Sequence, residues 1–120
     1  MIERVRSGSA TLESDPHSFT NRIHRDDAAA AIVHLVTMPG APEKIYVGSD
    51  HEPTPKGQVE RFLAGHLGVS VAIRERSEPS SGANKRCRND LLRASGYEFR
   101  YPTYREGYRA VLAGSGRRHP

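Results

Sequence analysis

The sequence offers one group of side chains suited to binding an anionic ligand, and all of its members are basic. These candidate substrate-binding residues are Arg22, Arg76, Lys85 and Arg86. The planar guanidinium of arginine fits a carboxylate or phosphate with two parallel hydrogen bonds, whereas lysine contributes a point charge. The alternative is that these side chains are solvated or pair with nearby acids such as Asp26. Both interpretations stay open at this level.

Other reactive side chains give weaker signals. Histidine and carboxylate ligand types stand side by side at 24–26 and 50–52. Neither cluster has the helical spacing or the cysteine pairs that are typical of a zinc site. Cys87 is the single cysteine, so an internal disulfide is excluded, and its type favours a small structural residue over a nucleophile. We therefore predict no metal site and no catalytic residue.

The sequence lacks the motifs of dinucleotide chemistry. A dinucleotide fold needs a glycine-rich turn between a strand and a helix, and no such turn is present. Gly65 and Gly68 instead stand at the end of a predicted helix. Hydride chemistry based on tyrosine would need a lysine four residues later, but these positions hold Asp50, Tyr101, Arg105, Tyr108 and Leu112. We therefore predict that this chain alone binds no cofactor and catalyses no such reaction.

Length and composition set the frame for these residues. With 120 residues, one domain is the natural expectation. The net charge of +4 and the isoelectric point of 9.6 favour anionic partners without naming one. No apolar run approaches the roughly 20 residues that span a bilayer, and residues 1–6 do not resemble a signal peptide. We expect a cytoplasmic protein without a membrane partner.

The first half of the chain predicts two strand–helix pairs. Alternation predicts a strand over 19–25, and a helix should follow from 28 to about 38, opened by Asp26 and Asp27. This helix is apolar almost all round, which favours cover on more than one face. A second strand is predicted at 44–48. The next helix should begin with Thr54 as its N-cap and end at Gly68. Its predicted apolar face consists of Val59, Phe62, Leu63, His66 and Leu67.

The second half predicts shorter elements. Residues 69–76 should be a strand or an extended connection, 85–88 a short strand, and 97–101 extended. Asn89 should cap a helix over 90–95, and Thr103 with Glu106 should form a capping box for a last helix. Residues 1–18 and 115–120 should be flexible. The predicted fold class is α/β, or an α+β-like fragment, with few strands and about four helices.

Four segments in this order resemble the extended or atypical short-chain dehydrogenases, the NAD(P)-dependent epimerase/dehydratase family. The segments are NRIHRDDAAAAI at 21–32, IYVGSDHEPT at 45–54, NKRCRN at 84–89, and GYEFRYP at 96–102 followed by YREG at 104–107. Together they extend the resemblance over about residues 19–113. The similar part of the family is the C-terminal, substrate-side portion of a Rossmann-type protein.

The resemblance implies a partial domain over 1–120, with the N-terminal dinucleotide-binding half absent. In the family that half holds NAD(P) and the catalytic Tyr and Lys. The chain is then a truncated or degenerate product, one half of a split protein, or a sequence whose true start lies upstream. The implied partners are a missing N-terminal half or a homologous subunit, together with a small-molecule substrate.

One departure from the family bears on the substrate. Nucleotide-sugar members carry a phosphate-binding Arg at the position of Thr20, whereas this chain has its charge at Arg22. A shift of two residues along a strand moves the charged group by about 6–7 Å. The departure puts a nucleotide-sugar diphosphate in doubt and favours the atypical branch.

Two alternatives remain for the chain as a whole. One is a small basic module that binds nucleic acid or another anionic partner. Basic residues gather between 74 and 93, but no recognised nucleic-acid motif surrounds them, which disfavours nucleic acid. The other is a structural or regulatory fragment that pairs with a full-length relative.

Overall fold

A computed structural model describes residues 1–8, 12–75 and 84–115 of the chain. The chain forms two compact units. The first contains Met1–Thr20 and Pro53–Arg86, and the second contains Asn21–Glu52 and Cys87–Pro120. The sequence predicts one partial domain, and that interpretation stays a prediction.

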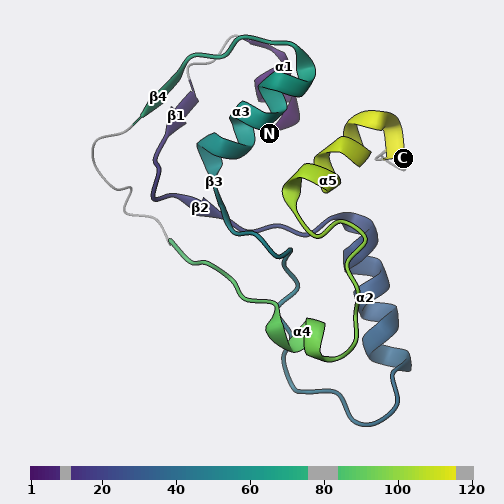
Figure 1. Ribbon diagram of the computed structural model, residues 1–120. Helices are drawn as coiled ribbons and strands as arrows, with labels where there is room; N and C mark the ends of the chain where they lie inside the picture. Colours follow the sequence, from purple (N-terminus) through teal and green to yellow (C-terminus); the bar gives the residue numbers. More distant parts are fainter. Residues whose placement is uncertain (9–11, 76–83, 116–120) are drawn as a thin grey trace. The chain divides into compact units, whose positions relative to one another are not determined.

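The first unit packs two helices beside two very small sheets (Figure 1). Strands β1 (Leu12–Ser14) and β4 (Ile73–Glu75) pair in parallel, with Leu12 opposite Ile73. Strands β2 (Phe19–Thr20) and β3 (Thr54–Pro55) pair antiparallel, with Phe19 opposite Pro55.

The core of the first unit lies between helices α1 (Ile2–Arg6) and α3 (Lys56–Leu67). Val5 of α1 and Val59 and Leu63 of α3 are completely buried. Helix α3 ends at Gly68, whose φ of 65° is a left-handed conformation that glycine adopts without strain. The predicted helix end is therefore confirmed. Its predicted apolar face is confirmed at Val59 and Leu63, whereas His66 is exposed.

The second unit is built around helix α2 (Arg25–Thr37). It also contains α4 (Asp90–Ala94), α5 (Tyr104–Ala110) and a wider last turn, η1 (Val111–Ser115). The chain after α4 packs on α2, because Nε2 of His34 lies 3.1 Å from the carbonyl oxygen of Ser95. The core residues of this unit include Ala31, Leu92 and Tyr104.

Several predicted strands are wrong in this structure. Only Phe19–Thr20 of the predicted strand 19–25 pairs with another strand, and 44–48 and 85–88 are irregular. A strand needs a neighbouring backbone, and no described strand lies beside 44–48, where Ile45 is 75% exposed. The segment 97–101 is irregular and contains no strand.

Two predicted helix starts are also wrong. Helix α2 begins at Arg25, since the side chain of His24 caps it instead of Asp26 or Asp27. Helix α3 begins at Lys56, because Thr54 and Pro55 belong to β3. Asn89 does stand at the N-cap of α4, but its amide donates to the Ser49 carbonyl oxygen at 2.9 Å and makes no cap hydrogen bond.

The capping box at the start of α5 is confirmed. The Thr103 hydroxyl accepts from the backbone N–H of Arg105 at 3.2 Å. The Glu106 carboxylate accepts from the Thr103 backbone N–H at 3.0 Å and from the Thr103 hydroxyl. In the part of the chain that the structure describes, no helix has the length and apolar character needed to cross a bilayer.

The capping box makes a pH-dependent contribution to stability. The hydrogen bond from Thr103 holds the pKa of Glu106 below its ordinary value of 4.5. The stabilisation is therefore complete above that value and is lost as the pH falls through the lower folded-state pKa. We expect Glu106→Gln to reduce the free energy of unfolding by about 1 kcal/mol at pH 7 and by much less near pH 3. Urea unfolding at both pH values measures this, with exposed Glu98→Gln as the control. An equal loss at both pH values would contradict the assignment.

Candidate functional site

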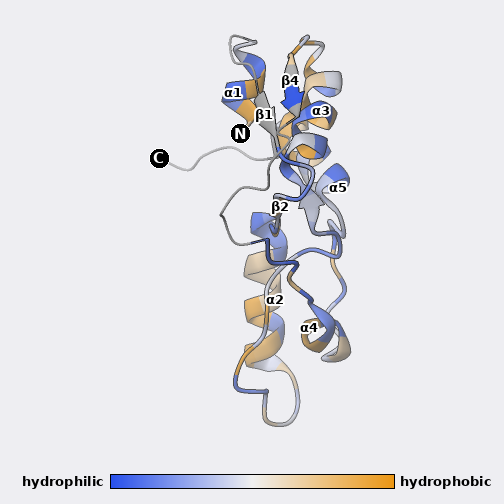
Figure 2. Ribbon diagram, turned by 90° about the vertical axis from the view of Figure 1, so that its left-hand side faces the viewer, coloured by the Kyte–Doolittle hydropathy of each residue, from blue (hydrophilic) through white to orange (hydrophobic). Residues whose placement is uncertain are grey.

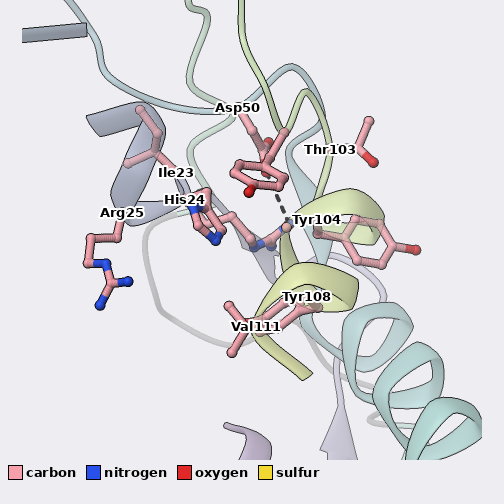
Figure 3. Close-up of a pocket in the computed structure, with 11 residues that line it drawn as sticks. Ile23, His24, Arg25, Asp50, Thr103, Tyr104, Tyr108 and Val111 are labelled. Carbon is pink, nitrogen blue, oxygen red and sulfur yellow. Dashed lines mark ion pairs between the residues drawn. The ribbon is translucent and has the colours of Figure 1, made fainter. Parts of the chain in front are cut away.

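A cavity of about 280 Å³ lies within the second unit. Three stretches of chain form it: the segment that enters α2, the loop at Asp50, and the segment from Tyr101 through α5 (Figure 3). Its polar or aromatic lining residues are Arg22, His24, Arg25, Asp50, Tyr101, Thr103, Tyr104 and Tyr108. Ile23, Gly107 and Val111 complete the lining.

His24 is a buried polar group of the cavity. Its Nδ1 accepts a hydrogen bond from the backbone N–H of Asp26 at 3.1 Å, which caps α2. An accepting Nδ1 carries no proton, so the proton of the neutral ring lies on Nε2. The side chain is only 5% exposed, and Nε2 has no hydrogen-bond partner among the residues that the structure describes. His24 therefore brings a buried donor to the cavity.

The ring of Tyr101 fixes the orientation of His24. The two ring centroids lie 3.9 Å apart with an interplanar angle of 35°. Gly107 of α5 lies behind the imidazole, where a Cβ would stand 3.7 Å from Cδ2 of His24. The imidazole is thus held between α5 and the segment that precedes it, and it has little freedom to turn.

Arg22 and Asp50 form the charged part of the cavity. Nη1 of Arg22 lies 3.9 Å from Oδ2 of Asp50, and its guanidinium carbon lies 5.5 Å from the centre of the Tyr104 ring. The backbone N–H of Asp50 donates to the Arg22 carbonyl oxygen at 2.6 Å, which ties the two segments together. Burial raises the pKa of Asp50, although the Glu52 N–H and Arg22 oppose this effect. Burial thus destabilises the charged form of this carboxylate.

The tyrosines give the cavity aromatic walls. Tyr104 is buried, and the guanidinium carbon of Arg105 lies over its ring, 4.5 Å from the ring centroid. Burial raises the pKa of Tyr108, so its hydroxyl keeps its proton at neutral pH. A protonated phenol can both donate to and accept from a ligand.

Asp27 positions the segment that carries Tyr101. Its carboxylate accepts hydrogen bonds from the backbone N–H groups of Arg100 at 2.8 Å and Tyr101 at 2.9 Å. It also accepts from the Tyr97 hydroxyl at 2.7 Å. Burial and the bond to Asp27 raise the pKa of Tyr97 to about 12, so this donor stays protonated. One buried carboxylate in the first turn of α2 therefore anchors the opposite wall of the cavity.

The predicted binding residues do not all meet at this site. Arg22 lines the cavity, whereas Lys85 and Arg86 are exposed in the first unit, where the Arg86 guanidinium lies 4.2 Å from the centre of the Phe19 ring. Arg76 lies outside the described residues. A ligand role for each of these four side chains stays a prediction.

Sequence reasoning missed most of the cavity. His24, Asp50, Tyr101, Tyr104 and Tyr108 were not among the predicted site residues. A histidine directly before a helix could have been recognised as a side-chain cap, but the meeting of segments far apart in the chain leaves no local signal. Among the described residues, no group of three or more His, Cys, Asp or Glu side chains is placed to hold a metal ion.

Comparison with known proteins gives a structural result. No family model matches the chain, and no curated protein matches its sequence. A solved structure of a proposed NAD-dependent epimerase/dehydratase from Methylobacillus flagellatus is similar, with a TM-score of 0.73 and 31% identity over 97% of this chain. A functionally unknown conserved protein from Silicibacter pomeroyi DSS has a TM-score of 0.73 and 25% identity over 93% of this chain.

The similarity covers only part of each neighbour. This chain spans 42% of the first neighbour and 43% of the second. The mixed fold of helices and small sheets therefore matches a portion of an epimerase/dehydratase-like structure. The likeness is compatible with a fragment of such a protein.

The Asp27 carboxylate should contribute more to stability than its neighbour. Asp27→Asn replaces an accepting oxygen with a donor that faces other donors, so we expect a loss of about 2–4 kcal/mol in the free energy of unfolding. Asp26→Asn is the matched control, because this adjacent side chain is 37% exposed and should cost less than about 1 kcal/mol. Urea unfolding of both variants measures the difference. Equal losses would show that Asp27 does not anchor the 97–101 segment.

Proposed function

We propose that this chain is the C-terminal, substrate-side lobe of an NAD(P)-dependent epimerase/dehydratase-like protein of the short-chain dehydrogenase type. The observation that carries the proposal is the structural match over 97% of this chain to 42% of the Methylobacillus flagellatus protein. The four sequence segments that resemble the family support it, because they stand in the family's order.

In this proposal, cofactor binding and substrate binding belong to two different parts of a protein. Neither the glycine-rich cofactor turn nor a tyrosine with a lysine four residues later is present in this sequence. NAD(P) and the catalytic groups therefore belong to another part, either a separate polypeptide or a longer form of the chain. This lobe supplies the cavity around His24 and Arg22 for the substrate, and it is inactive alone.

An exposed apolar stripe on α2 supports the existence of such a partner. Ile32 is 63% exposed, Val33 is 61% exposed and Val36 is 79% exposed. At 100° per residue these side chains fall on one face of the helix together with Ala29. Figure 2 shows the later turns of α2 in orange, the colour of hydrophobic residues. A contiguous apolar face on a helix marks an interaction surface.

We assign this stripe to the cofactor-binding part. This chain matches less than half of each structural neighbour. The remaining part of such a protein could therefore cover the apolar stripe. Ile45, in a segment with the sequence of a strand but without a strand partner among the described residues, is another exposed apolar side chain of the same unit.

The stripe makes the isolated chain prone to self-association. We expect Val36→Glu to shift the chain toward the monomer, because a charge on the stripe opposes its burial against another apolar surface. Sedimentation equilibrium measures the change. Gln58→Glu adds the same charge at an exposed position of α3 and serves as the control. A wild-type chain that is strictly monomeric at all concentrations would count against the proposal.

A titration with NADH and NADPH tests whether this chain alone binds the cofactor. The isolated chain should leave NADH and NADPH fluorescence unchanged. Binding of either nucleotide with reduction of a carbonyl substrate by this chain alone would overturn the proposal.

A further inference from the structure

We propose that the cavity in the second unit binds a small organic carboxylate, whose oxygens accept hydrogen bonds from Nε2 of His24 and from Arg22. The inference rests on the proposed function only in taking this cavity as the ligand site of the lobe. It names a ligand class that neither the fold nor the neighbours specify.

His24 requires an acceptor on the ligand. Its Nδ1 is occupied by the cap hydrogen bond from Asp26, so the proton is on Nε2. That donor belongs to a side chain that is 95% buried and lines the cavity, and it has no partner among the described residues. A buried donor without an acceptor is costly, and most such groups in proteins are satisfied. A ligand oxygen in the cavity would remove that cost.

The charges around the cavity favour an anion. Two arginines, Arg22 and Arg25, line the cavity together with one carboxylate, that of Asp50. Arg25 is 54% exposed and lies 3.5 Å from Asp26, so solvent and that carboxylate weaken its effect. Arg22 is only 17% exposed and therefore acts more strongly within the cavity. Its planar fork fits the two oxygens of a carboxylate.

The aromatic and aliphatic walls of the cavity favour an anion that carries an organic group. The rings of Tyr101, Tyr104 and Tyr108 and the side chains of Ile23 and Val111 line the remaining surface. An inorganic ion would leave these apolar walls uncovered, whereas a planar organic acid would pack against them. The volume of about 280 Å³ is slightly below the roughly 300–1,000 Å³ typical of ligand sites, so the cavity suits a small ligand. A dinucleotide is too large for it.

Titration of the isolated chain with benzoate tests the ligand class. Benzoate joins a carboxylate to a flat apolar ring, and benzamide has the same shape without the charge. We expect benzoate to shift the ring-nitrogen signals of His24 in histidine-labelled NMR spectra, and benzamide to bind at least about tenfold more weakly. Equal binding of the two, no binding of benzoate, or saturable binding of inorganic phosphate alone would overturn the proposal.

Three substitutions separate a direct contact from a general loss of structure. His24→Asn keeps a side-chain oxygen to cap α2 but removes the Nε2 donor, so benzoate should bind about tenfold more weakly. Arg22→Gln should also weaken binding. Asp50→Asn should strengthen it about threefold or more, because a negative charge leaves the cavity while the oxygen that accepts from the Glu52 N–H remains.

Arg22→Gln and Asp50→Asn are expected to change benzoate affinity in opposite directions, which a general loss of structure would not do. His66→Asn, at an exposed histidine of α3, should leave benzoate affinity unchanged. If His24→Asn fails to fold, the opposite effects of Arg22→Gln and Asp50→Asn still decide the matter. Unchanged affinity in the folded variants would reject the ligand class and leave the lobe assignment standing. Benzoate binding in a chain that also turns over NADH alone would instead reject the lobe assignment.

Discussion

The carboxylate of Asp27 is the interaction on which the second unit depends. It lies in the first turn of α2, is 1% exposed, and accepts hydrogen bonds from two backbone N–H groups and one tyrosine hydroxyl. The segment 97–101 has no regular secondary structure, so its backbone donors need partners from elsewhere. Asp27 supplies them and at the same time places a negative charge at the positive end of the helix. Contacts of Tyr97 with His34 and of Tyr101 with His24 add to this anchor.

The order within the cavity follows from this anchor. Because Asp27 fixes the backbone of Tyr101, the tyrosine ring is held where it packs on His24. His24 in turn uses one ring nitrogen to cap α2 and presents the other to the cavity. The cap thus has a chemical consequence, because it determines which nitrogen carries the proton. One side chain thus combines a structural hydrogen bond with a buried donor at the cavity.

The sequence predicted the parts of this structure that depend on local chemistry. Gly68 at the end of α3 and the Thr103–Glu106 capping box are written in short motifs, and both are present. The strand predicted at 44–48 was wrong, because a strand also needs a neighbouring strand, which local alternation does not reveal. The cavity was also beyond prediction, because Asp50 and Tyr101 line it beside His24 through a tertiary arrangement that no spacing along the chain encodes. Arg22 alone was found, from its charge.

Helix α2 connects the cavity with the exposed apolar stripe. Its first turn carries Asp27 and is capped by His24, whereas its later turns expose Ile32, Val33 and Val36. A helix of 13 residues is stiff over this length, so a body packed on the later turns constrains the direction of the first turn as well. Cover on the apolar stripe would therefore reduce the freedom of the His24 donor and of the segment anchored by Asp27. In a lobe that completes a larger protein, the helix that receives the partner is then the same helix that orients the ligand-binding group.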